Sequence, residues 1–287
     1  MSDSPITETI DTFTASDGYP LRLRHWRPVT SPRGTVVCLH GIQSHAGWYT
    51  RSCSELANAG FEVRFLDRRG SGMNETERGH AVHAERLIND VSQFLTSIQC
   101  NNGPIFLTGI SWGARLAAVV AKRRPDLLAG LTLLGPGIYG RVGPRWYQRM
   151  ALRAAMAIGK THHRVKIPLA DPALFTNDLE WQEFIRTDAA TLREITTSLV
   201  TAGIALERES QAAAEQICIP TLVMLAGTDR IIDNPQTQKW FKRLGTSETT
   251  LIEYPTAAHT LEFERECPFI ADWQKWLATQ VKHTDQK

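Results

Sequence analysis

A serine between glycines is the residue of this chain best placed to act as a nucleophile. Residues 109–113 have the sequence Gly-Ile-Ser-Trp-Gly, which fits the pattern G-x-S-x-G. In that pattern a sharp turn between a strand and a helix presents the serine hydroxyl above the sheet, and the glycines prevent clashes. The apolar residues 105–108 predict the strand, and the small residues 113–118 predict the helix. A chance match to the pattern on a surface turn would not have a strand before it and a helix after it. We therefore predict that Ser111 is a nucleophile.

A serine hydroxyl needs a base, and the base needs a group that orients it. Asp229 follows the apolar run 219–226, and His259 follows the run 250–254. Both therefore lie at the carboxyl ends of predicted strands, where open α/β sheets place their sites. We predict that His259 removes the proton of Ser111 and that Asp229 orients the imidazole ring.

The acid has a nearby alternative. Asp233 lies four residues after Asp229, but its position before Asn234 and Pro235 is typical of a helix cap. The chain has nine histidines, and His259 is the one whose order and setting suit a triad with Ser111.

Two backbone amides are expected to stabilise the oxyanion that forms during acyl transfer. One belongs to Trp112, directly after the nucleophile, and the other to Ile42, in the loop after the predicted strand 35–40. His40 is expected to brace this loop by hydrogen bonds and is also a candidate pocket residue. Gln43 is a second candidate, at the mouth of the site.

Predicted strands and helices alternate along most of the chain, which indicates a parallel sheet covered by helices. Short strands at 12–14 and 21–26 predict an antiparallel hairpin at the sheet edge. Residues 137–212 contain no strand-like run and are interrupted by prolines, so we predict an inserted helical cap there. The catalytic core then consists of a first part, 1–136, and a second part, 213–287.

Composition and charge are those of an ordinary globular protein. The 287 residues are 42% hydrophobic and 22% charged. The formal net charge is only +2, which does not indicate a basic surface for binding nucleic acid. The five cysteines show no metal-ligand spacing, so neither a metal site nor a disulfide framework is expected. Cys38 and Cys218 are predicted to be buried. Residues 1–5 lack signal-peptide features and no run of 18 apolar residues occurs, which predicts a cytoplasmic protein.

Taken together, these motifs resemble the branch of the α/β-hydrolase superfamily that contains monoacylglycerol lipases and lysophospholipases, grouped with serine aminopeptidase S33-like hydrolases. The resemblance implies the α/β-hydrolase fold, with a mostly parallel eight-stranded sheet flanked by helices and an inserted helical cap. It also implies the triad Ser111, Asp229 and His259, with no metal or organic cofactor. The matching segments span nearly the whole chain: 40–49, 67–72, 109–114, 227–233 and 259–262.

The chain departs from the family pattern in ways that concern the substrate, not the chemistry. Relatives near monoacylglycerol lipase have a glycine and a glutamate after the His-Gly-x stretch, whereas Ile42, Gln43 and Ser44 stand in this part of the chain. Asn74 stands where a serine is frequent. Haloalkane dehalogenases and epoxide hydrolases have an aspartate in place of Ser111, which disfavours those reactions.

The predicted cap contains a stretch, 145–156, that combines aromatic residues, methionines and arginines. Such a helix could lie at a membrane surface or admit an acyl chain. The simpler alternative is that its apolar stripe packs on the catalytic core. Because a cap faces the site, some of its apolar residues are expected to wall the substrate pocket. The candidates are Trp146, Met150, Phe175, Trp181, Leu199 and Ile204.

The leading interpretation is a carboxylic ester hydrolase that cleaves a monoacylglycerol or lysophospholipid-like ester through an acyl-enzyme on Ser111. The same triad could serve a thioesterase, an amidase, a C–C bond hydrolase or an acyltransferase. A ligand-binding protein that kept the fold without catalysis is a further alternative. The expected partner is a small ester, with peripheral membrane contact through the cap as an added hypothesis; the sequence indicates no oligomeric state.

Overall fold

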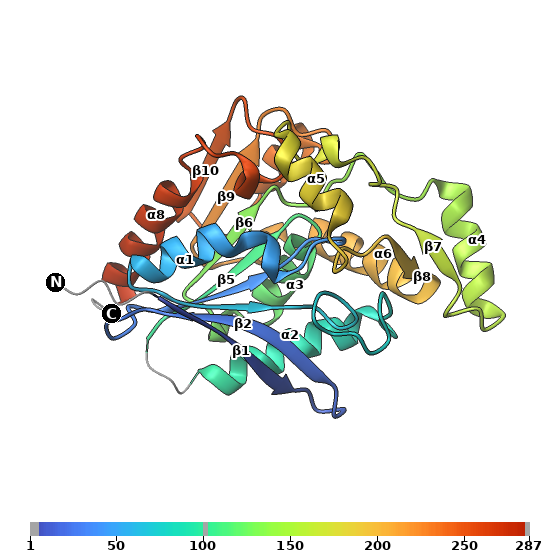
Figure 1. Cartoon of the computed structure of the whole chain (residues 1–287), viewed down its shortest axis with the longest axis horizontal. Coiled ribbons are helices and arrows are strands. Elements are labelled where there is room, and N and C mark those ends of the chain that lie inside the picture. Colours follow the sequence, from blue (N-terminus) through green and yellow to red (C-terminus); the bar gives the residue numbers. More distant parts are fainter. Residues whose placement is uncertain (1–5, 100–102, 285–287) are drawn as a thin grey trace.

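The computed structural model describes residues 6–99 and 103–284, and an eight-stranded sheet forms its centre (Figure 1). The strand order is β1-β2-β4-β3-β5-β6-β9-β10. Pairing is antiparallel from β1 to β2 and from β2 to β4, and parallel across the rest of the sheet. The mostly parallel sheet expected from the resemblance is therefore confirmed. The strands are β1 (Thr7–Thr14), β2 (Pro20–Arg27), β3 (Thr35–Leu39), β4 (Glu62–Leu66), β5 (Ile105–Ile110), β6 (Gly130–Leu134), β9 (Thr221–Ala226) and β10 (Thr249–Tyr254).

Side chains of the central strands alternate between two apolar layers. In β3, Val37 and Leu39 point into one layer, whereas Val36 and Cys38 point into the other, and all four are buried. Because both faces of the sheet are covered, these strands are mostly apolar along their whole length and do not alternate between apolar and polar residues. This explains why they are the clearest strand signals in the sequence.

Helices cover the two faces of the sheet. Residues of α2 (Ala84–Ile98), α3 (Gly113–Arg123) and α7 (Asn234–Phe241) belong to the first layer, and those of α1 (Thr50–Asn58) and α8 (Phe269–Thr284) to the second. Figure 1 shows α1 and α8 together on one side of the sheet. Single 3-10 turns complete the connections: η1 (Ala46–Tyr49), η2 (Pro125–Leu127), η3 (Pro172–Leu174), η4 (Ala214–Gln216) and η5 (Leu261–Phe263).

Between β6 and β9 the chain leaves the sheet. This segment forms α4 (Trp146–Ala157), β7 (Arg164–Lys166), α5 (Leu179–Thr187), β8 (Glu194–Thr196) and α6 (Thr197–Ala212). In Figure 1, α4 and β7 lie at the right-hand end of the molecule, away from the sheet. The expectation that residues 137–212 contain no strand is wrong, because β7 pairs antiparallel with β8. Each of these strands has three residues, too few to produce a period of two in the sequence.

Two further expectations need correction. The first strand begins at Thr7, not at residue 12, because an edge strand with an exposed face can contain polar residues such as Glu8 and Asp11. Cys218 is exposed in the connection before β9, between the buried Ile217 and Ile219, whereas Cys38 is buried within β3. Cys100 and residues 1–5 lie outside the described residues. In the described part of the chain, no helix combines the length and apolar character needed to cross a bilayer.

Candidate active site

Ser111 lies on a sharp turn between β5 and α3. Its φ is +52°, in the left-handed region that residues with a Cβ seldom adopt. A Cβ on Gly109 would lie 2.6 Å from the Cα of Ala114, and a Cβ on Gly113 would lie 2.4 Å from the carbonyl oxygen of Leu39. These two positions therefore need glycine, which is the physical reason for the spacing in the sequence pattern.

Three side chains from the ends of three strands meet at this turn. The Oγ of Ser111 lies 2.9 Å from Nε2 of His259, and Nδ1 of His259 lies 2.7 Å from Oδ2 of Asp229. Ser111 follows β5, Asp229 follows β9 and His259 follows β10. Asp229 and His259 are buried, so water competes little for these hydrogen bonds. The structure thus brings together the residues that the sequence predicted as a triad.

The surroundings of Asp229 keep its carboxyl group ionised. Burial alone would raise the pKa of Asp229, but His259 and two backbone amides hold that pKa below its usual value. The amides of Ile231 and Ile232 donate to Oδ1 at 2.7 and 2.9 Å. An ionised carboxylate can only accept hydrogen bonds. Nδ1 of His259 therefore carries the proton, and Nε2 is free to accept the proton of Ser111.

Asp233, the alternative acid, is engaged at the start of a helix. Its Oδ1 accepts a hydrogen bond from the amide of Gln236 at 3.0 Å, which makes it the N-cap of α7. Its Oδ2 accepts from the side chain of the same Gln236 at 2.8 Å. Since His259 contacts Asp229 instead, the geometry favours Asp229 as the acid.

Two backbone amides beside Ser111 lack an acceptor within the protein. Over the residues that the structure describes, the amides of Ile42 and Trp112 donate to no protein group, and both residues line the same cavity as Ser111. Trp112 directly precedes α3, so its amide lies at a helix N-terminus, where an anion is favoured. These are the two donors that the sequence predicts for the oxyanion.

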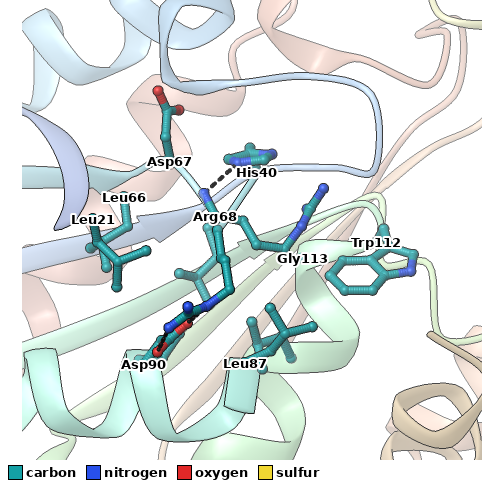
Figure 2. A pocket seen from close by; sticks show the side chains of 13 residues that line it. Leu21, His40, Leu66, Asp67, Arg68, Leu87, Asp90, Trp112 and Gly113 are labelled. Carbon is teal, nitrogen blue, oxygen red and sulfur yellow. Dashed lines mark hydrogen bonds and ion pairs between the residues drawn. The ribbon is translucent and has the colours of Figure 1, made fainter. Parts of the chain in front are cut away.

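Hydrogen bonds from His40 and Arg68 hold the loop that carries Ile42, and Figure 2 shows the bond between these two residues. Nδ1 of His40 donates to the carbonyl oxygen of Gly41 at 2.7 Å, and Nε2 accepts from the amide of Arg68 at 2.8 Å. The guanidinium of Arg68 donates to the carbonyl oxygens of Gly41 and Ile42, both at 3.1 Å. Burial and the charge of Arg68 hold the pKa of His40 well below its usual value, so its ring is neutral. His40 is thus the predicted brace of the loop.

The sequence alone did not predict the part played by Arg68, although this residue lies in the matching segment 67–72. Its guanidinium also lies over the ring of Trp112, 4.7 Å from the ring centroid. Arg68 therefore contacts both segments that carry the candidate oxyanion donors. The signal in the sequence was its position two residues after the apolar end of β4, the strand that lies beside β3 in the sheet.

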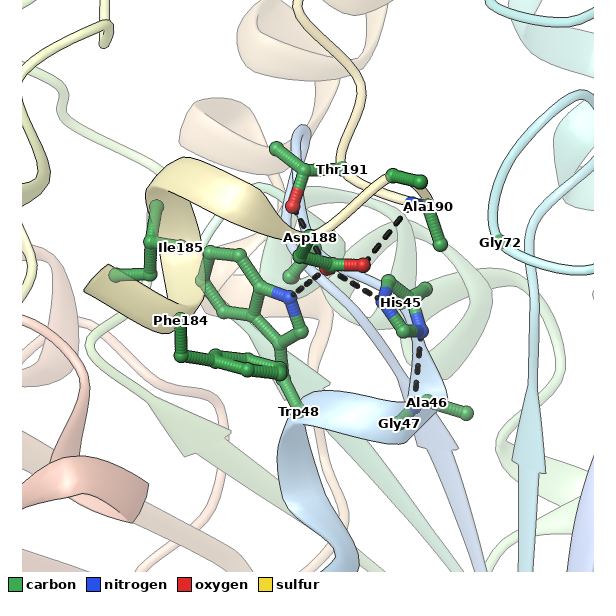
Figure 3. A network of polar contacts seen from close by, with 12 residues as sticks. His45, Ala46, Gly47, Trp48, Gly72, Phe184, Ile185, Asp188, Ala190 and Thr191 are labelled. Atoms are coloured by element: carbon green, nitrogen blue, oxygen red, sulfur yellow. Dashed lines mark hydrogen bonds and ion pairs between the residues drawn. The ribbon is translucent and has the colours of Figure 1, made fainter. Parts of the chain in front are cut away.

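A second connection joins the same loop region to the segment inserted between β6 and β9 (Figure 3). Asp188, at the end of α5, accepts hydrogen bonds from Nε2 of His45 at 2.8 Å and Nε1 of Trp48 at 2.9 Å. Burial alone would raise the pKa of Asp188, but these donors hold it far below its usual value. Nearby, the amide of Leu192 donates to the carbonyl oxygen of Gln43 at 2.9 Å. The end of α5 is therefore fixed against the loop that carries Ile42.

A cavity of about 790 Å³ opens beside Ser111. Ile42 and Trp112 line it next to the serine, and Gln148, Leu152 and other residues of the inserted segment form its walls. The apolar part of this lining includes Leu152, Val165, Ile167, Leu169, Val200 and Ile204. A volume of this size suits a small organic molecule. A second cavity at Ser111, also lined by His259, holds only about 20 Å³.

The predicted pocket residues are distributed over several places. Ile204 lines the large cavity. Gln43 and Phe175 line the small cavity beside Ser111. Trp181 lines neither of these cavities, because its ring stacks on Phe263 with a centroid distance of 4.5 Å.

The other predicted pocket residues lie away from both cavities. Trp146 and Met150 are 78% and 55% exposed, because they lie on the outer face of α4. Leu199 is buried in the first apolar layer, and His40 lies behind the loop of Ile42. The prediction that this helix contributes to the pocket agrees with the structure, but it named residues on the wrong face. Leu152 of α4 lines the large cavity, whereas Trp146 and Met150 do not.

Within the described residues, one group of side chains could hold a metal ion. Glu77, His80 and His162 offer ligand atoms that lie within 4.8 Å of one another. The rings of His80 and His162 stack at 4.2 Å, and Nδ1 of His80 lies 3.0 Å from Oγ1 of Thr196. None of these three candidate ligands lines either cavity at Ser111, so the group is separate from the candidate active site.

Comparisons with known proteins agree with this fold. An abhydrolase domain-containing protein of Dictyostelium discoideum is 27% identical over 97% of this chain, which covers 30% of that protein. A monoacylglycerol lipase of Mycolicibacterium smegmatis is 24% identical over 96% of this chain and 99% of the lipase. The crystal structure of the Paleococcus ferrophilus monoacylglycerol lipase gives a TM-score of 0.82 at 22% identity, covering 91% of this chain and 99% of that one. The family model described as serine aminopeptidase, S33, matches residues 30–266. The chain therefore belongs to the serine aminopeptidase S33 family of α/β-hydrolases.

Proposed function

We propose that this chain is a serine hydrolase that cleaves the carboxylic ester of a single-chain lipid, a monoacylglycerol or lysophospholipid-like molecule, without a metal or organic cofactor. The observation that carries the proposal is the hydrogen-bonded series from Ser111 through His259 to Asp229 beside a cavity of about 790 Å³. The monoacylglycerol lipases among the relatives support an ester as the bond that is cleaved.

The first half of the reaction forms an acyl-enzyme. The Oγ of Ser111 attacks the ester carbonyl carbon while its proton passes to Nε2 of His259. The charge that develops on the carbonyl oxygen is stabilised by the amides of Ile42 and Trp112. When the tetrahedral intermediate collapses, the alcohol leaves with the proton from His259. Asp229 stabilises the imidazolium ion and keeps its ring oriented.

The second half releases the acid. A water molecule gives its proton to Nε2 of His259 and attacks the acyl carbon of the acyl-enzyme. Collapse of the second tetrahedral intermediate returns the proton to the Oγ of Ser111 and frees the carboxylic acid. The same amides serve both halves, because the oxyanion forms at the same place twice.

We propose that residues 137–212 act as a cap between two parts of the catalytic core, 1–136 and 213–287. The inserted segment supplies most of the apolar lining of the large cavity. It is also tied to the loop of Ile42 through Asp188. A cap in this position would select the substrate while the core performs the chemistry.

Esters of increasing chain length test this proposal. A fluorophosphonate probe should label Ser111, and p-nitrophenyl esters should be turned over faster as the chain lengthens from acetate toward medium length. Each methylene group that enters the apolar part of the cavity contributes about 0.8 kcal/mol, about fourfold in kcat/KM. Matched thioesters and amides measure whether the ester is preferred. Turnover of the acetate ester alone would exclude an acyl lipid as substrate.

We also propose that the outer face of α4 contacts a membrane surface. No residue of α4 is fully buried, and Trp146 and Met150 are largely exposed. Burying such side chains in the interfacial region of a bilayer is favourable. Replacing both with glutamate should weaken binding to anionic phospholipid vesicles by about tenfold or more in a sedimentation assay.

The control for vesicle binding is Val29→Glu with Val82→Glu, which places the same added charge on two apolar residues outside α4 that are 70% and 57% exposed. This double control should bind vesicles as the unaltered protein does. Equal binding by the α4 variant and the control would exclude α4 as the contact surface.

A further inference from the structure

The cavity beside Ser111 is strongly basic. Its lining contains five cationic side chains and a single carboxylate, that of Glu207. The formal charge of the lining is therefore +4 with His163 neutral, whereas the whole chain carries +2. The rest of the chain is thus net acidic, and the positive charge is a local property of the cavity. The five cationic residues are Arg115, Arg141, Arg149, Lys160 and Lys166.

Glu207 neutralises only part of this charge. The guanidinium of Arg149 lies 3.2 Å from Glu207, and that of Arg115 lies 4.0 Å from the same carboxylate. Across the described residues, Arg141, Lys160 and Lys166 form no ion pair. Two arginines thus share one carboxylate. Arg141, Lys160 and Lys166 line the cavity, are exposed to solvent and have no carboxylate partner in the described part of the chain.

The cations come from several elements around the cavity. Arg115 lies in the first turns of α3, close to Ser111 in sequence, and Arg149 lies on α4. Lys160 follows α4, and Lys166 ends β7. Apolar side chains such as Leu152 lie among them in the same lining. The cavity therefore combines an apolar wall with cations on several sides.

This combination suits neither a neutral lipid nor a simple ion. A neutral ligand would leave the positive charge of the lining without a counter-charge and would gain nothing from it. An anion without an apolar part would leave the apolar wall unused. Cations gathered around a concave surface concentrate a positive field there and attract a ligand of opposite charge.

We propose that this cavity binds an acyl ester that also carries a phosphate or carboxylate group separate from the ester bond. The inference rests on the ester hydrolysis proposed above and narrows its substrate class. The anionic group must occupy the large cavity, because the second cavity at Ser111 holds only about 20 Å³. The apolar wall receives the acyl chain, and the cations receive the anionic group.

Paired substrates that differ only in charge test the proposal. Monodecanoylglycerol phosphate is compared with monodecanoylglycerol, which places the anion on the alcohol side. The p-nitrophenyl monoester of adipic acid is compared with p-nitrophenyl hexanoate, which places it on the acyl side. The kcat/KM of the anionic member should exceed that of the neutral member in at least one pair. A kcat/KM for the neutral member that equals or exceeds that of the anionic member in both pairs would overturn the proposal.

A double variant, Lys160→Gln with Lys166→Gln, identifies the groups responsible. It should lower the ratio of anionic to neutral kcat/KM by about tenfold, since each charge near an anion contributes about threefold in a partly exposed site. The loss should appear chiefly in KM and should shrink at high salt, because added ions screen the same interaction. The matched control is Lys242→Gln with Lys275→Gln, which removes two exposed lysines outside the cavity. An equal change in ratio for both double variants would overturn the proposal.

Failure of the charge preference can be told apart from failure of the proposed reaction. Labelling of Ser111 by a fluorophosphonate and turnover of neutral esters test the reaction alone. If no ester is turned over, calorimetric binding of the two decanoyl compounds to the Ser111→Ala protein still tests the charge preference. Equal affinity for the two compounds in that experiment would overturn it.

Discussion

Replacement of Ser111 by alanine is expected to lower ester turnover by about 10⁴- to 10⁶-fold. The change removes the proposed nucleophile, the Oγ of Ser111, and leaves His259 and Asp229 hydrogen-bonded to each other. The residual rate comes from the amides of Ile42 and Trp112, which still stabilise an oxyanion formed by attack of water. The measurement is kcat with a p-nitrophenyl ester, together with labelling by a fluorophosphonate probe.

The control for this variant is Ser97→Ala, a matched change at an exposed serine of α2 that lines neither cavity at Ser111. It should keep full turnover and full labelling. Circular dichroism and thermal unfolding establish that both variants are folded. Turnover by folded Ser111→Ala protein within about tenfold of the unaltered protein would exclude Ser111 as the nucleophile.

The triad geometry could be predicted because each member depends on local sequence. Ser111 needs a strand, a tight turn and a helix within ten or so residues, and each of these has its own signal. Asp229 and His259 each follow an apolar strand, and parallel strands bring their carboxyl ends to one edge of the sheet. No long-range packing had to be known to place these three residues at the same edge.

The lining of the cavity could not be predicted in the same way. Trp146 and Leu152 belong to one helix, and only the packing of α4 decides which of them faces the cavity. Arg68 and Asp188 act on a loop that is distant from them in the sequence. The strands β7 and β8 pair across the inserted segment with three residues each. Such features depend on tertiary contacts that short-range patterns do not encode.

The two candidate acids are separated by matched amide substitutions, Asp229→Asn and Asp233→Asn. Asp229→Asn is expected to lower kcat by about 10⁴-fold. An asparagine amide at position 229 can donate to Nδ1 of His259, which would move the ring proton to Nε2. His259 would then present a donor to Ser111, where a base is required, and the imidazolium would lose its negative partner.

Asp233→Asn should leave kcat within about threefold of the unaltered value, because asparagine caps a helix almost as well as aspartate. The two side chains lie on one short segment, so general disturbance of that segment would affect both variants alike. Rates of fluorophosphonate labelling should follow the same order as kcat, since labelling also needs the base. A larger loss in Asp233→Asn than in Asp229→Asn would identify Asp233 as the acid. It would also mean that the 2.7 Å contact between His259 and Asp229 does not orient the catalytic base.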